Sequence, residues 1–165
     1  YRVDASKIIL AGHSMGGFAA FRTGCDYSEI NNLISFAGFN FGFFAKLAAS
    51  DQEYYELSLE RMERDANIFS NSKPQKLLDE MITCADNFDL INFAEELSKK
   101  NILCITAKYD SLAPAEIHAI PLAKAIRKFN PSKFVDIILD SGHSFSNSRI
   151  KLSRAIVNWL NKINF

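Results

Sequence analysis

The segment Gly12–Gly17 reads Gly-His-Ser-Met-Gly-Gly and lies between an apolar run and a helix-compatible segment. It matches the pattern G-x-S-x-G, in which a sharp turn from strand to helix strains the serine and exposes its hydroxyl. We expect Gly12 and Gly16 to be required, because a β-carbon at either position would clash across the turn. The segment predicts that Ser14 is a nucleophile, in preference to an incidental serine in a glycine-rich turn.

A glycine-rich turn before a helix can also bind phosphate, because helix N-termini attract anions. These glycines do not have the spacing G-x-G-x-x-G, and no lysine follows them as a P-loop requires. Nucleotide binding is therefore a weak competitor.

A serine nucleophile needs a neighbouring base, and the sequence offers three histidines. His13 is beside Ser14, and we expect its side chain to point away from the nucleophile in a structural role. His118 lies in the loop or first turn before a predicted helix. His143 follows the last predicted strand, and the carboxyl ends of parallel strands meet at one edge of a sheet. His143 is the predicted base.

Two aspartates are candidates to orient that base. Asp110 follows the predicted strand that ends at Ala107, at the same edge of the sheet. Asp140 lies three residues before His143, a position that suits bonding within the loop. Asp110 is favoured because the order Ser, Asp, His accompanies this type of serine turn, and Asp140 remains the alternative.

Hydrophobic patterns define the elements that must position these residues. Short apolar runs at 7–11, 32–37, 101–107 and 134–139 predict strands, the first of them buried on both faces. Helices are predicted after residue 17 with Gly24 as a stop, over 119–129 with Pro121 near the start, and over 150–163.

The segment between the second and third strands is predicted to be helical and charged. Ser50 and Glu53 form a capping-box pattern for a helix that runs to about Ala66. A second helix opens at Ser72 with Pro74 in its first turn, and a third covers 89–99. The order of elements predicts an α/β chain with a helical insertion.

Composition limits the classes of function. The 165 residues are 48% hydrophobic and 23% charged, which fits one compact domain and excludes disorder. The 19 basic and 19 acidic side chains cancel, so nucleic-acid binding is disfavoured. The stretch Leu33–Ala49 is interrupted by polar residues and is no membrane span.

Cysteine usage predicts a reducing, cytoplasmic location. Cys25, Cys84 and Cys104 are far apart and show no C-x-x-C spacing, so we interpret them as reduced core thiols. No H-E-x-x-H motif or carboxylate–histidine cluster is present, and we expect neither a metal nor a cofactor.

Three segments together resemble the α/β-hydrolase superfamily of serine esterases, lipases and peptidases. GHSMGG at 12–17 resembles its nucleophile elbow, YDSLAP at 109–114 its acid loop, and SGHSF at 141–145 its histidine loop. The resemblance implies that Ser14 attacks an acyl carbonyl, that His143 moves the proton and that Asp110 orients His143. It also implies that the backbone N–H of Met15 helps to bind the oxyanion.

The resemblance further implies a partial fold. We expect a parallel sheet of about four strands with flanking helices, in which 1–38 and 101–165 form part of a hydrolase core and 39–100 form a helical lid. Phe39 and Phe41 are predicted to wall an apolar acyl pocket, with packing inside the lid as the alternative.

In the superfamily the elbow follows the fifth of eight strands, whereas only Tyr1–Ser6 precede the first strand here. Roughly 70 to 100 residues of strands and helices would be missing, so we interpret the sequence as a C-terminal half. We expect the isolated chain to be weakly active or inactive without its second oxyanion donor, and to self-associate through an unpaired sheet edge.

The expected function is cleavage of a carboxylic ester, thioester or amide of a small acyl substrate through an acyl-enzyme, with esters favoured over peptides. Two alternatives stay open. One is a non-catalytic fragment or pseudoenzyme that acts as a binding module, and the other is an acyltransferase that uses the same three residues.

Overall fold

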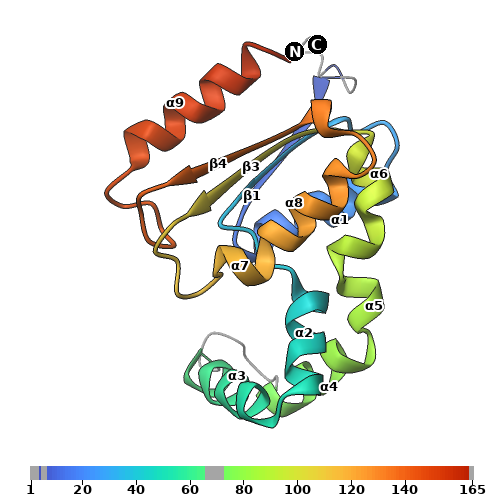
Figure 1. Ribbon diagram of the computed structural model, residues 1–165, viewed down its shortest axis with the longest axis vertical. Coiled ribbons are helices and arrows are strands. Elements are labelled where there is room, and N and C mark those ends of the chain that lie inside the picture. Colours follow the sequence, from blue (N-terminus) through green and yellow to red (C-terminus); the bar gives the residue numbers. More distant parts are fainter. Residues whose placement is uncertain (1–3, 5–6, 66–72, 164–165) are drawn as a thin grey trace. The chain divides into compact units, whose positions relative to one another are not determined.

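A parallel four-stranded sheet forms the centre of the chain (Figure 1). The computed structural model describes residues 4, 7–65 and 73–163. The strands β1 (Ile9–His13), β2 (Asn32–Phe36), β3 (Asn101–Ala107) and β4 (Phe134–Leu139) lie side by side in chain order. The predicted α/β class and the predicted four-stranded parallel sheet are confirmed.

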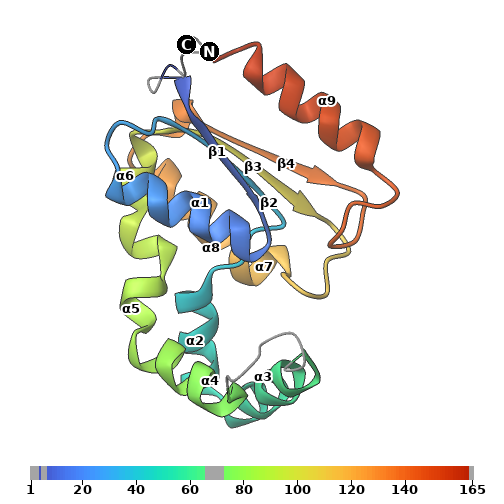
Figure 2. The same ribbon diagram turned by 180° about the vertical axis from the view of Figure 1, so that it is seen from behind.

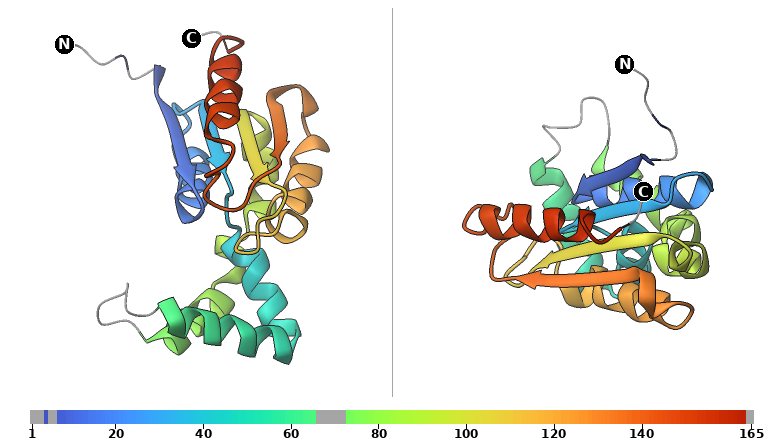
Figure 3. Two further views of the ribbon diagram at one scale, coloured as in Figure 1. Left: turned by 90° about the vertical axis from the view of Figure 1, so that its left-hand side faces the viewer. Right: turned by 90° about the horizontal axis from the view of Figure 1, so that it is seen from above.

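Helices cover both faces of this sheet (Figures 2 and 3). One face carries α1 (Met15–Asp26), α6 (Ala94–Ser98) and α8 (Ile120–Arg127), and the other carries α9 (Arg149–Leu160). Alternate residues of β3 serve the two sides, since Ile102 packs with Phe21 and Ile126 whereas Ile105 packs with Trp159. Burial on both faces explains why the sequence of β3 is a continuous apolar run.

Two predictions about the first βα unit are wrong. The first strand was placed at 7–11 and buried on both faces, but β1 spans Ile9–His13 and leaves Ala11 and His13 exposed. The reason is that β1 is the edge strand of the described sheet and α9 lies over β3 and β4. Helix α1 also continues past Gly24. This glycine is buried against Leu33, whose side chain would lie 2.6 Å from an added β-carbon, so packing and not helix termination explains the glycine.

The chain divides into two compact units, 1–39 with 90–165 and 40–89. The second unit contains α2 (Phe41–Ser50), α3 (Gln52–Asp65), α4 (Pro74–Thr83) and α5 (Ala85–Phe88). The first unit also holds the short helices η3 (Leu90–Phe93), α7 (Ala115–His118) and η4 (Pro131–Lys133). Within it Leu90 and Leu97 are buried in the core beneath α1 and α8.

The predicted capping box at Ser50 is wrong. Ser50 is the last residue of α2, and its hydroxyl donates to the carbonyl of Leu47 (3.0 Å). Asp51 has an extended backbone, and its carboxylate accepts a hydrogen bond from the N–H of Tyr54 in the first turn of α3 (3.1 Å). Pro74 begins α4 as predicted, whereas the predicted helix limits Ala66 and Ser72 lie outside the described residues.

The three cysteines are free thiols, of which Cys104 is buried and Cys25 and Cys84 are half-buried. Burial raises the pKa of Cys25 to about 11 and that of Cys104 to about 12. No helix in the described part of the chain is long and apolar enough to cross a membrane.

Candidate active site

Ser14 stands in a strained turn between β1 and α1. Its backbone has φ 55° and ψ −120°, a combination that non-glycine residues rarely adopt. The end of β2 and the loop after it hold the residue there: its N–H donates to the carbonyl of Phe36 (3.1 Å), and its carbonyl accepts from the N–H of Phe39 (3.2 Å). The predicted strain at this serine is thus present in the structure.

The glycines around Ser14 have different reasons to be small. A β-carbon on Gly12 would lie 1.9 Å from the carbonyl oxygen of Gly16, as the predicted clash requires. A β-carbon on Gly16 would meet nothing within 4 Å, so the prediction that Gly16 is required is wrong. The constrained position is Gly17, where a β-carbon would lie 2.4 Å from the hydroxyl oxygen of Ser35. Sequence reasoning did not identify Gly17 as constrained, although the adjacent glycines Gly16 and Gly17 were a signal for it.

Met15 is the first residue of α1. Its N–H therefore has no hydrogen-bond acceptor inside the helix, and it lies at the end where helix dipoles favour negative charge. That placement suits an oxyanion donor.

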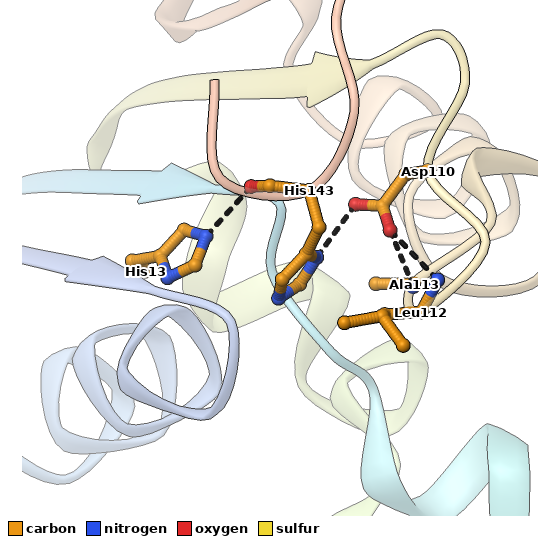
Figure 4. Close-up of polar contacts among 5 residues, drawn as sticks. All are labelled: His13, Asp110, Leu112, Ala113 and His143. Atoms are coloured by element: carbon orange, nitrogen blue, oxygen red, sulfur yellow. Dashed lines mark hydrogen bonds and ion pairs between the residues drawn. The ribbon is translucent and has the colours of Figure 1, made fainter. Parts of the chain in front are cut away.

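Asp110 and His143 meet as a hydrogen-bonded pair (Figure 4). The Nδ1 of His143 lies 2.8 Å from Oδ2 of Asp110, whose side chain is 1% exposed. The other carboxylate oxygen accepts hydrogen bonds from the N–H groups of Leu112 (2.9 Å) and Ala113 (2.8 Å). A carboxylate only accepts, so in the neutral imidazole of His143 the proton sits on Nδ1 and Nε2 keeps the lone pair of a base.

The alternative acid and the third histidine lie elsewhere. The Asp140 carboxylate is exposed and lies 3.3 Å from the Nζ of Lys108. His118 is buried, with its ring centroid 3.9 Å from that of Phe39. Neither side chain takes part in the Asp110–His143 pair.

The loop that carries His143 is closed by its own polar groups and tied to the acid loop. The hydroxyl of Ser141 donates to the side-chain oxygen of Asn147 (2.5 Å), and the N–H of Tyr109 donates to the carbonyl of Ser141 (2.9 Å). Phe145 is buried under the loop with φ 54°. The loop is therefore a compact turn rather than an extended segment.

His13 contacts this loop as well, which sequence reasoning did not foresee. Its Nε2 lies 2.8 Å from the carbonyl oxygen of His143, and the two ring centroids are 4.6 Å apart (Figure 4). Within the described residues no hydrogen bond joins the Ser14 hydroxyl to His143. Hydrogen bonds between nucleophile and base are often long in proteins without substrate and tighten when it binds.

The two aromatic residues predicted to wall a pocket belong to different units. Phe39 lines a small cavity of the first unit with Ser35 and His118, whereas Phe41 begins α2 in the second unit. Their role toward an acyl group stays a prediction. A larger groove of about 450 Å³ runs along α8 and β4, and no residue of the proposed triad lines it.

No family model matches the sequence, and no curated protein matches it either. Solved structures do match. An α/β-hydrolase enzyme from the metagenome of sediments of the Mar Chica lagoon in Morocco aligns over 98% of this chain and 64% of its own, with 15% identity and a TM-score of 0.63. The esterase Pf2001 of Pyrococcus furiosus aligns over 94% of this chain and 54% of its own, with 16% identity and a TM-score of 0.62.

Dipeptidyl peptidase 4 of Porphyromonas gingivalis aligns over 98% of this chain and 20% of its own, with 18% identity and a TM-score of 0.67. At these identities the similarity is one of fold, and this chain has the fold of α/β-hydrolase enzymes. It spans 64% and 54% of the first two matched chains.

Proposed function

We propose that this chain carries the catalytic triad of a serine hydrolase, with Ser14 as nucleophile, His143 as base and Asp110 as the acid that orients the base. The observation that carries the proposal is the buried Asp110–His143 hydrogen bond at the sheet edge where Ser14 sits in its strained turn. The α/β-hydrolase fold, shared with esterases and a peptidase, supports the same class.

The proposed reaction proceeds through an acyl-enzyme. The Ser14 hydroxyl attacks the acyl carbonyl while Nε2 of His143 takes its proton, and the buried Asp110 carboxylate stabilises the resulting imidazolium. The N–H of Met15 donates to the developing oxyanion. His143 then protonates the leaving group, and water releases the acyl group by the reverse sequence of proton transfers.

The proposed substrate is a small ester, with thioesters and amides as the neighbouring classes. The proposed setting is the cytoplasm. Of the predicted lid 39–100, the helical unit 40–89 is proposed as the lid, since Leu90 and Leu97 pack in the core of the sheet unit. Phe39 and Phe41 are proposed to contact the acyl group. The superfamily resemblance of the three loops supports these assignments. Transfer of the acyl group to an acceptor other than water would use the same residues.

The test uses the complete natural protein that contains this sequence. We expect it to cleave a p-nitrophenyl ester and to be labelled by a fluorophosphonate at Ser14, and Ser14→Ala to abolish both. The exposed Ser28 gives a matched control, since Ser28→Ala is expected to keep both activities. Absence of labelling and of cleavage in the wild-type protein would overturn the proposal and favour the binding-module interpretation.

A further inference from the structure

His13 joins the strand that carries the nucleophile to the loop that carries the base. Its Nε2 lies 2.8 Å from the backbone carbonyl oxygen of His143, across 130 positions of sequence. A carbonyl only accepts, so Nε2 of His13 must bear the proton, and this hydrogen bond fixes the tautomer of its ring. Ser14 is the next residue in the chain, so the contact spans from the elbow to the base.

The ring of His13 is also packed on its neighbours. Its centroid lies 5.7 Å from that of Phe36 in a stacked arrangement and 6.4 Å from that of Phe145 in an edge arrangement. Phe36 ends β2, and Phe145 is the strained buried residue of the histidine loop. These contacts hold the imidazole in the position from which it donates.

Besides the hydrogen bonds within the histidine loop, two contacts tie this loop to the acid loop. Asp110 holds the His143 ring, and the N–H of Tyr109 holds the carbonyl of Ser141 (2.9 Å). Both of these belong to the acid loop after β3. In the described part of the chain, the hydrogen bond from His13 is the one that links β1 to the backbone of this loop, so it sets the base relative to the nucleophile.

We propose that His13 is a positioning residue, which acts by donating from Nε2 to the carbonyl of His143 and so holds the base in register with Ser14. This proposal rests on the proposed serine hydrolase function. A displacement of about 1 Å in a catalytic group can cost about 100-fold in rate, so a small shift of the loop is sufficient for a measurable effect.

Two substitutions separate the donor from the ring. His13→Phe keeps an aromatic ring against Phe36 but has no donor. His13→Gln places an amide N–H the same number of bonds from Cα as Nε2, but loses the ring. We expect kcat for a p-nitrophenyl ester to fall about 10- to 100-fold in His13→Phe with KM unchanged, and to fall no more than about threefold in His13→Gln.

Three results would overturn the proposal. Equal losses in the two variants would mean that the ring or the packing matters and not the donor. Wild-type kcat in His13→Phe would mean that the contact has no catalytic consequence. Thermal unfolding of each variant is measured alongside, and a loss of kcat that simply follows a loss of Tm also counts against it.

A second measurement does not depend on ester cleavage, and its first part uses the wild-type protein alone. ¹⁵N NMR of the wild-type protein must show His13 as the Nε2–H tautomer, and the low-field Nδ1 proton of His143, assigned by its absence in His143→Gln, must shift or broaden in His13→Phe. A His13 ring protonated on Nδ1 would refute the inference. If the wild-type protein is not labelled at Ser14 but these signals behave as expected, the proposed function fails while the positioning role of His13 stands.

Discussion

At the residue scale, backbone strain gathers where the proposed chemistry lies. The three non-glycine residues with positive φ in the described chain are Ser14, Ala37 and Phe145, and each follows the carboxyl end of a strand. Such conformations cost about 1–3 kcal/mol each and persist where the surroundings hold them. Here the hydrogen bonds from Ser14 to Phe36 and from Ala37 to Ile105 (2.8 Å) provide that hold.

The buried acid yields a prediction about tautomers. In Asp110→Asn, the side-chain oxygen still accepts from Leu112 and Ala113, so the amide NH₂ faces Nδ1 of His143 and stabilises the wrong tautomer. We expect kcat for ester cleavage to fall about 10³–10⁴-fold.

Asp140→Asn is the matched control for this substitution. It removes only an exposed ion pair with Lys108, and such pairs contribute about 0–1 kcal/mol of stability. Steady-state kinetics of the two variants decides the assignment, and a larger loss in the Asp140 variant would reverse it.

At the scale of elements, the elbow depends on how closely α1 approaches β1 and β2. Gly17 lies opposite Ser35, and Gly12 lies opposite the carbonyl of Gly16, so two glycines permit the approach and a third does not contribute. Gly12 pairs with Ser35 in the register of β1 and β2, so the two close contacts of α1 lie beside each other on the sheet.

The glycines predict unequal effects of one added methyl group. Gly17→Ala forces a contact of 2.4 Å with Ser35 and is expected to lower the free energy of unfolding by about 1–3 kcal/mol, as overpacking does. Gly16→Ala meets open space and gains helix propensity, so we expect a change of at most about 1 kcal/mol in its favour. Urea denaturation of the pair measures both, and equal destabilisation would contradict the packing argument.

At the scale of the whole molecule, a sheet unit and a helical unit share one chain, and each has its own packed interior. The edge strand β1 pairs with β2 alone among the described residues, which keeps self-association through this edge as a proposal. The thiols of Cys25 and Cys104 also belong to the sheet unit, and they titrate only in alkaline solution.

The raised pKa values of Cys25 and Cys104 predict how the free energy of unfolding changes with pH. The folded protein raises the pKa of Cys25 from 9.0 to about 11 and that of Cys104 from 9.0 to about 12. Below pH 9.0 the thiols are neutral in both states and the stabilisation is complete. Above it the unfolded thiols ionise first, so the free energy of unfolding falls as pH rises toward about 11.

Urea unfolding across this range in the wild type and in the double variant Cys25→Ala, Cys104→Ala checks this prediction. The double variant must show the shallower decline, because lysine and tyrosine titrations are common to both proteins. Identical slopes would contradict it.

Sequence alone determined much of the fold and the candidate triad, because the signals are local. Apolar runs placed β2, β3 and β4 within a residue of their limits, and the distinctive Gly-His-Ser-Met-Gly-Gly segment marked the strand-to-helix turn. Chain order together with the shared edge of a parallel sheet selected Asp110 and His143, which the structure brings to 2.8 Å.

Tertiary structure decided what depends on neighbours distant in sequence. The need for Gly17 rather than Gly16 arises from Ser35 on another strand, and the cap at Asp51 rather than Ser50 follows from where α2 ends. The contact of His13 with the carbonyl of His143 joins groups 130 positions apart. Periodicity reports which face of an element is apolar, whereas these features depend on distances between elements, which are fixed only when the sheet assembles.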